Sequence, residues 1–272
     1  QGDFRTLFRG HGVDLADLRE YQHHDDPRHI DWNVTARLTV PHVRQFTEER
    51  DLTAWFLLDL SPSVDFGSQR RKREVSETFV AVLASLVVRH GNRAGAVLYG
   101  NQVETVLPPR SGRHHVLHLM QRMRERPTTP AAGATRLADL IERARPNIKR
   151  RSAIFVVSDF ISEAGWEAPL ARLAQRHDVV AVRLYDPFEM TLPELGLVLM
   201  QDAETGEQIF VDTGARGFRE RFEAAAARRE AELRESLARA GIDTLELPTD
   251  GDLSESILAF VDARRQRSRL AA

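Results

Sequence analysis

The chain has 272 residues, of which 42% are hydrophobic and 29% charged; this composition is typical of a folded globular protein and excludes wholesale disorder and fibrous repeats. Its 38 basic and 40 acidic residues give a net charge of -2, which argues against a general nucleic-acid binder, because such proteins need surplus cations to displace counterions from phosphate. The absence of cysteine excludes disulfides, thiolate zinc sites, iron–sulfur clusters and thiol nucleophiles.

Membrane insertion is not expected. The longest apolar run, residues 79–88, is far shorter than the ~20 residues that a membrane-spanning helix needs. The first residues show no positively charged leader followed by an apolar stretch. We therefore expect a cytoplasmic protein.

Residues 1–50 differ from the rest of the chain, because they hold five of the ten histidines and show little apolar periodicity before Val40. We interpret residues 19–32 as an ordered loop or short helical turns, and the alternating residues 42–46 as a strand. Ile30 and Trp32 are apolar among charged neighbours, so we expect them to anchor this N-terminal extension on the following domain.

From Leu52 onward, apolar strands alternate with amphipathic helices. The continuous apolar runs at 54–58 and 153–157 are typical of strands buried on both faces. Further strands are predicted at 94–99, 102–107, 179–184 and 243–247, and a β-hairpin at 197–201 and 208–212. Helices are predicted at 71–90, 114–124, 137–145, 169–176 and 216–240, followed by a last helix that ends near 264.

Such alternation implies parallel pairing through right-handed crossovers. We therefore predict an α/β domain over residues 51–264, doubly wound and Rossmann-type, with a mainly parallel sheet, helices on both faces and the hairpin as an insertion. Residues 265–272 are predicted to be a basic tail, frayed and solvated. In this class of sheet, binding sites collect at the carboxyl edge of the strands.

The loop after the first buried strand carries one carboxylate and two hydroxyls, on Asp59, Ser61 and Ser63. Alternate side chains of an extended turn point the same way, so these groups converge. They are hard oxygen ligands, which suit Mg²⁺ or Mn²⁺ and do not suit soft metals. The alternative is a cluster that caps a helix N-terminus, where serine and aspartate are also common.

Two further loops of the predicted carboxyl edge add a hydroxyl and a second carboxylate. Thr135 stands just before a predicted helix, and Asp159 ends the second apolar strand. The order Asp-x-Ser-x-Ser, then Thr, then Asp resembles the metal-ion-dependent adhesion site of von Willebrand factor A domains. That resemblance implies a metal held by Asp59, Ser61, Ser63, Thr135 and Asp159, although Ala134 stands where the site usually has a second glycine.

The N-terminal segment carries a second resemblance. Together with Lys72, several stretches are similar to the "domain of unknown function 58" family; they are residues 19–21, 25–37, 48–51, 158–160 and 202–207. His24 replaces the family's usual glycine before the acidic pair. Many members carry membrane helices and a β-rich domain upstream. This chain resembles the short soluble members, which are encoded beside MoxR-type AAA+ ATPases.

The resemblance implies a non-enzymatic adaptor that acts with such an ATPase in the assembly, maturation or remodelling of client proteins. Two carboxylates and three neutral hydroxyls would leave a Mg²⁺ ion partly hydrated. A carboxylate of the ATPase or of the client could then replace a water and complete the shell. The alternative is a Mg²⁺-dependent hydrolase or phosphatase, but no residue of these loops is an obvious base or nucleophile.

Other candidates are weaker. The pair His114 and His118 could bind zinc on one helix face, but a solvated face is the more common structure, and no glutamate supplies the base of a metalloprotease. A second cluster, His23, His24, Asp25 and His29, is more simply a polar, irregular segment. Only Lys72 and Lys149 are lysines, a bias that we attribute to the codon usage of a GC-rich genome.

Overall fold

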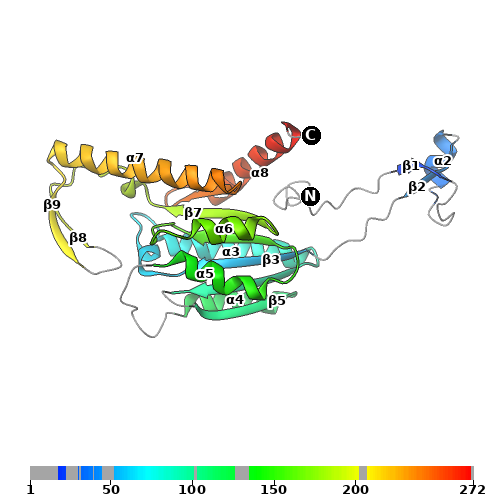
Figure 1. Cartoon of the computed structure of the whole chain (residues 1–272), viewed down its shortest axis with the longest axis horizontal. Helices are drawn as coiled ribbons and strands as arrows, with labels where there is room; N and C mark the ends of the chain where they lie inside the picture. Colours follow the sequence, from blue (N-terminus) through cyan, green and yellow to red (C-terminus); the bar gives the residue numbers. More distant parts are fainter. Residues whose placement is uncertain are drawn as a thin grey trace. The chain divides into compact units, whose positions relative to one another are not determined.

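The computed structural model describes residues 18–22, 30, 32–38, 40–44, 52–100, 103–125, 135–201 and 207–270. The chain divides into two units, residues 1–51 and 52–272, and each is described by itself. Figure 1 shows the elements of both.

The described residues of the first unit form a small antiparallel strand pair and a helix. Strand β1 (Leu18–Glu20) pairs with β2 (His42–Arg44), and the backbone N–H of His42 donates to Oγ1 of Thr35 in α2 (Trp32–Leu38) at 3.1 Å. A strand therefore begins the segment that was expected to be a loop. Trp32 keeps 70% of its surface exposed, and its anchoring on the second unit stays a prediction.

The second unit is built on a six-stranded sheet in the order β10-β7-β6-β3-β4-β5, which confirms the mainly parallel α/β prediction (Figure 1). All neighbours in this sheet pair in parallel except β4 and β5. The strands are β3 (Thr53–Asp59), β4 (Arg93–Tyr99), β5 (Val103–Arg110), β6 (Ala153–Ser158), β7 (Asp178–Tyr185) and β10 (Asp243–Pro248). Because β3 and β6 are adjacent and parallel, their carboxyl ends lie side by side.

Helices cover both faces of the sheet. On one face, Phe79 of α3 (Lys72–Arg89) packs edge-on against Phe155, with 6.0 Å between ring centroids, and Phe155 stacks on Phe56 at 5.5 Å. The same face carries α4 (Arg113–Arg124) and α8 (Leu253–Leu270). On the other face, a core around Trp55 and Leu57 includes residues of α5 (Leu137–Ala144), α6 (Glu167–Ala174) and the end of α7 (Arg216–Arg239).

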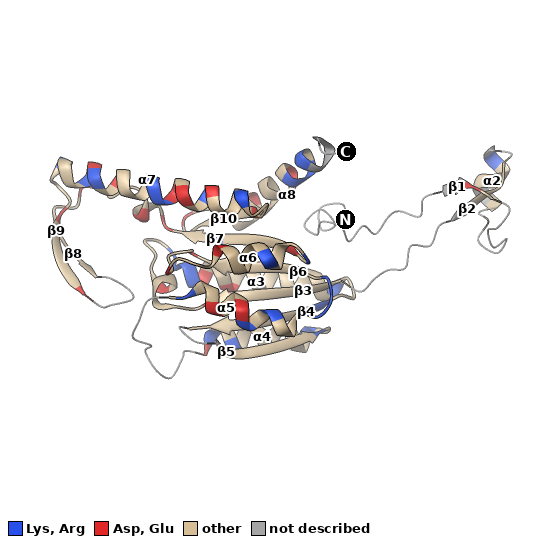
Figure 2. Ribbon diagram, viewed as in Figure 1, with Lys and Arg blue, Asp and Glu red and all other residues tan. Residues whose placement is uncertain are grey.

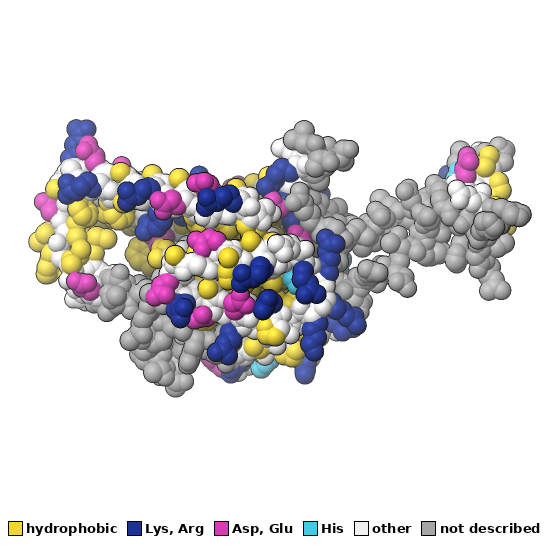
Figure 3. All heavy atoms as spheres, in the orientation of Figure 1, with side chains coloured by type: hydrophobic (Ala, Val, Ile, Leu, Met, Phe, Trp, Pro, Cys, Tyr) yellow, Lys and Arg dark blue, Asp and Glu magenta, His cyan; other side chains and the backbone are white. Residues whose placement is uncertain are grey.

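The predicted hairpin is present as β8 (Leu197–Gln201) and β9 (Gln208–Asp212). Leu199 and Phe210 face each other across it and are 50% and 73% exposed, and Figure 3 shows hydrophobic side chains gathered there. Charges of both signs alternate along α7 (Figure 2). An ion pair of 2.5 Å between Arg183 of β7 and Glu230 ties α7 to the sheet.

The prediction of a frayed tail is wrong for residues 265–270, which are helical. Helix α8 continues to Leu270, because Arg264 is 3% exposed and its guanidinium lies 2.7 Å from Asp178 and 2.8 Å from Asp243. Arg267 adds a second contact to Asp243. These ion pairs hold the last turns of the helix against the amino ends of β7 and β10.

None of the helices that the structure describes is both long enough and apolar enough to cross a membrane.

Candidate metal site

Asp59 is the first predicted ligand, and the sheet holds it rigidly. It ends β3, between the two neighbouring strands β4 and β6, and its side chain is fully buried. The backbone N–H of Ser61 donates to Oδ1 at 3.0 Å, and the hydroxyl of Ser158 donates to Oδ2 at 2.7 Å. Both oxygens therefore have fixed positions, and each retains a lone pair for a further donor or cation.

Ser61 and Ser63 lie directly beyond Asp59. Their hydroxyl oxygens are 3.1 Å apart, and both residues are buried. Ser61 stands before the short 3-10 helix η2 (Pro62–Asp65), yet its side chain makes no capping hydrogen bond. The cluster is therefore not explained by helix capping, which was the alternative for this loop.

Asp159 comes directly after β6, the strand next to β3 in the sheet. The N–H of Ile161 donates to its Oδ1 at 3.0 Å, and the ammonium of Lys72 donates to its Oδ2 at 2.6 Å. The next residue, Phe160, has a φ of 59°, a left-handed conformation that bulky residues rarely adopt. Its N–H donates to the Ser158 hydroxyl and its ring packs against Trp166, and these contacts hold the turn in place.

Thr135 is placed beside the β6 loop. Its backbone oxygen accepts hydrogen bonds from the Ser162 hydroxyl and the Glu163 N–H, both at 2.9 Å. The residue is 1% exposed and precedes α5, as predicted. The two preceding residues, 133 and 134, lie outside the described residues. The structure thus joins the loop of Thr135 to the loop of Asp159.

The electrostatics of the site favour a cation. Burial, together with the nearby charge of Asp159, raises the pKa of Asp59 from 3.8 to about 6, although hydrogen bonds from Ser158 and Ser61 act in the opposite direction. Two carboxylates that are close and buried repel each other. A positive charge between them would remove this repulsion.

The donor set is compatible with a hard divalent cation. In the part of the chain that the structure describes, no group of three or more His, Asp or Glu side chains is arranged to hold a metal. A metal at this edge would therefore depend on the hydroxyls of Ser61, Ser63 and Thr135 together with the two aspartates. Neutral and anionic oxygens are the ligands that Mg²⁺ and Mn²⁺ accept, so the residues fit these ions.

Lys72 was named from the sequence only as part of the family resemblance and was given no place at the candidate metal site. Its ammonium bridges Asp159 and Oε1 of Glu189, at 2.6 and 2.7 Å, and its side chain is fully buried. Burial acts to lower the pKa of Lys72, but the two carboxylates outweigh it and the pKa is raised. The available signal was the rarity of lysine, which we had attributed to codon usage.

The structure tests one of the other sequence candidates. His114 and His118 are exposed on α4, as expected for a solvated face. The cluster at His23, His24, Asp25 and His29 lies outside the described residues.

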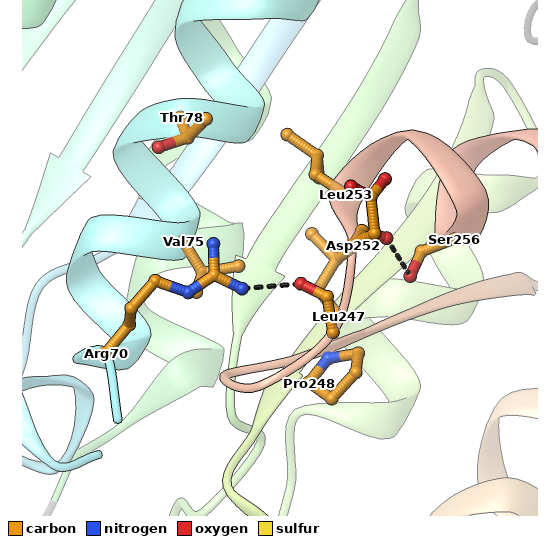
Figure 4. Close-up of a pocket in the computed structure, with 9 residues that line it drawn as sticks. Arg70, Val75, Thr78, Leu247, Pro248, Asp252, Leu253 and Ser256 are labelled. Atoms are coloured by element: carbon orange, nitrogen blue, oxygen red, sulfur yellow. Dashed lines mark hydrogen bonds between the residues drawn. The ribbon is translucent and has the colours of Figure 1, made fainter. Parts of the chain in front are cut away.

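A cavity between α3 and α8, lined by Arg70, Val75 and Leu253 among others (Figure 4), has a volume of about 10 Å³, which holds one water molecule at most.

The matching family model is "Protein of unknown function DUF58", over residues 17–232. An uncharacterized protein of Mycobacterium tuberculosis is 36% identical over 268 residues, which covers 97% of this chain and 84% of that protein.

Two solved structures are also similar. The conserved hypothetical protein BatB from Bacteroides thetaiotaomicron has 16% identity and a TM-score of 0.51, with 81% of this chain and 98% of that chain covered. An aerotolerance-related membrane protein from Bacteroides fragilis has 15% identity and a TM-score of 0.52, with 78% and 99% covered. At these identities the likeness concerns the fold.

Proposed function

This chain belongs to the DUF58 family. Because its parallel sheet brings together loops that resemble the metal site of von Willebrand factor A domains, we propose that it is a protein-binding adaptor whose contact with its partner depends on a divalent metal. Its fold supports a role in protein interaction. The metal would be Mg²⁺ or Mn²⁺, held by Asp59, Ser61, Ser63, Thr135 and Asp159.

The observation that carries the proposal is the buried pair Asp59 and Asp159 on adjacent strands, with the Ser61 and Ser63 hydroxyls 3.1 Å apart beside it. Burying two carboxylates together is unfavourable unless a cation or a proton compensates them. Lys72 pairs with Asp159, yet burial and the charge of Asp159 still raise the pKa of Asp59 to about 6. A bound divalent ion would compensate this charge and would supply a Lewis-acidic centre that attracts a further carboxylate.

The partner contact follows from the ligand count. Two anionic and three neutral protein ligands leave an exchangeable position on a hard ion, which usually keeps several waters. An aspartate or glutamate of another protein suits that position. We propose a MoxR-type AAA+ ATPase, or a client protein that such an ATPase remodels, as the source of the carboxylate; the family resemblance supports this choice.

The test measures partner affinity with and without the metal. The full chain is titrated with a MoxR-type ATPase encoded in the same genome, in Mg²⁺ and in excess chelator at fixed ionic strength. We expect the affinity of the wild type for the ATPase to be at least about tenfold lower in chelator than in Mg²⁺. The Asp59→Ala variant should show the same loss of affinity in Mg²⁺. The matched control is Asp250→Ala, an exposed aspartate outside the site, which should bind as the wild type does.

Equal affinities in both buffers would remove the metal from the interaction. The same samples also test the enzymatic alternative, by incubation with generic phosphate and ester substrates. Turnover that is present in the wild type and lost in Asp59→Ala would contradict a purely binding role.

A further inference from the structure

Lys72 forms ion pairs with two carboxylates beside the candidate metal site. Lys72 opens α3, and its fully buried ammonium contacts two carboxylates from different loops, Asp159 after β6 and Glu189 after β7. Because no part of the side chain reaches solvent, Lys72 cannot contact a partner protein. It acts on the side chains that enclose it.

One of those neighbours is a predicted metal ligand. The ammonium lies 2.6 Å from Oδ2 of Asp159, so it already supplies the positive charge that a divalent ion would bring to this carboxylate. Like charges at such short range repel strongly, and more so where water is excluded. A metal bound by Asp159 and the lysine on Asp159 are therefore in competition.

We propose that Lys72 is a built-in competitor of the divalent ion, which lowers the metal affinity of the Asp59–Asp159 site and so keeps metal binding reversible. The inference rests on the proposed function, because it concerns the regulation of the same site. In the metal-free state, Lys72 neutralises Asp159. When a metal binds, the ammonium gives up some or all of its contact with Asp159.

Glu189 makes this exchange possible. Its Oε1 accepts from Lys72 at 2.7 Å, while its Oε2 accepts from the backbone N–H of Asp186 at 3.1 Å. Asp186 is in turn fixed by hydrogen bonds from Ser68 and Thr249. Glu189 is therefore a second acceptor in a fixed position, so Lys72 retains one carboxylate when the metal takes the other.

The residue type agrees with this role. Of 38 basic residues, only Lys72 and Lys149 are lysines, so arginine serves at nearly every other position. A compact ammonium with three donors can divide its hydrogen bonds between two carboxylates, whereas a planar guanidinium favours bidentate pairing with one. Lysine is therefore suited to contact Asp159 and Glu189 together and to keep Glu189 when it gives up Asp159.

The experiment uses the metal alone as the probe. Mg²⁺ and Mn²⁺ are titrated calorimetrically into the full chain at one pH and ionic strength, for wild type and Lys72→Met. We expect Lys72→Met to bind the metal about tenfold more tightly or better. The matched control is Lys149→Met, which changes the net charge equally at an exposed position and should leave the affinity unchanged. Adding Asp59→Ala to Lys72→Met should abolish the gain.

Removal of Lys72 also leaves buried carboxylates without their cation, so stability is measured in parallel. We expect Lys72→Met to melt at a lower temperature in chelator and to be stabilised by Mg²⁺ more than wild type is. If Lys72→Met does not fold, Glu189→Gln provides the test. This substitution leaves Asp159 as the only carboxylate that contacts Lys72. It should therefore weaken metal binding several-fold. An unchanged affinity in Glu189→Gln would then overturn the inference.

The outcomes separate this inference from the proposed function. Equal metal affinity in wild type and Lys72→Met overturns the competition and leaves the proposed function intact. Binding by Lys72→Met alone supports the competition but contradicts a metal-dependent function of the native chain. Absence of binding in both contradicts both proposals.

Discussion

The ammonium of Lys72 and the carboxylate of Asp159 form a hydrogen-bonded ion pair of 2.6 Å, with side chains that are 0% and 1% exposed. The pair connects the start of α3 to the end of β6 at the carboxyl edge of the sheet. It places a cation beside the carboxylates that the family resemblance assigns to a metal. At this edge Lys72 contacts the carboxylates of Asp159 and Glu189, and Asp59 lies close to Asp159.

Asp59→Asn is expected to change how stability depends on pH in metal-free buffer. The pKa of Asp59 rises from 3.8 to about 6 in the folded state, so between these values the folded protein binds the proton more tightly than the unfolded chain. Its ionisation therefore destabilises the fold as pH rises from about 4 to about 6, and this cost persists at neutral pH. Asp59→Asn cannot ionise, so its stability does not fall for this reason as pH rises.

The measurement is the free energy of unfolding by urea, on both sides of pH 6, for wild type and Asp59→Asn. Their difference should grow in favour of the asparagine variant as pH rises. An exposed control, Asp250→Asn, should follow the wild type. A difference between wild type and Asp59→Asn that is constant with pH would show that Asp59 does not titrate in this range.

Asp186→Asn is expected to have the opposite pH dependence. Burial acts to raise the pKa of Asp186, but hydrogen bonds from Ser68, Thr249 and Phe188 outweigh it and lower the pKa below 3.8. Its contribution to stability is therefore present above about pH 4 and is lost as pH falls through the folded pKa. At neutral pH, Asp186→Asn should lose about 1–3 kcal/mol, and acid titration of both proteins should show that the loss shrinks at low pH.

Phe155→Ala is expected to cost about 3–5 kcal/mol of unfolding free energy. Phe155 is 1% exposed and contacts the rings of Phe56 and Phe79, so its truncation leaves a cavity between the sheet and α3. Phe210→Ala is the matched control, because the same truncation on a side chain that is 73% exposed should change stability by less than about 0.5 kcal/mol. Chemical denaturation of both variants gives the comparison.

Arg264→Leu tests whether the end of α8 belongs to the fold. The substitution leaves Asp178 without its 2.7 Å partner in a buried position, which costs about 3–5 kcal/mol in comparable buried ion pairs. Arg265→Leu is the control, since its ion pair with Asp262 is exposed and 3.7 Å long. Equal melting temperatures for the two variants would indicate that the ion pairs of α8 contribute little to stability.

The order of strands and helices in the second unit could be predicted from the sequence. Residues 54–58 and 153–157 are continuous apolar runs, and only a strand with both faces covered buries all of its side chains. Once strands and helices alternate, the crossover rule makes them parallel and places the Asp59 and Asp159 loops at one edge. The meeting of these two loops was thus predictable from chain order, whereas the choice of the five ligands rested on the resemblance and stays a prediction.

The tertiary structure alone decided which charged side chains meet. Lys72 and Arg264 look like ordinary members of a charged helix, because periodicity describes one helix and says nothing about what lies across from it. Their partners lie at the ends of other strands, Asp159 after β6 and Asp178 at the start of β7. Only the packing of α3 and α8 on the sheet brings the pairs within 2.6 and 2.7 Å. Electrostatic pairing depends on distance and burial in three dimensions, so the contact between Lys72 and Asp159 could not be read from the sequence.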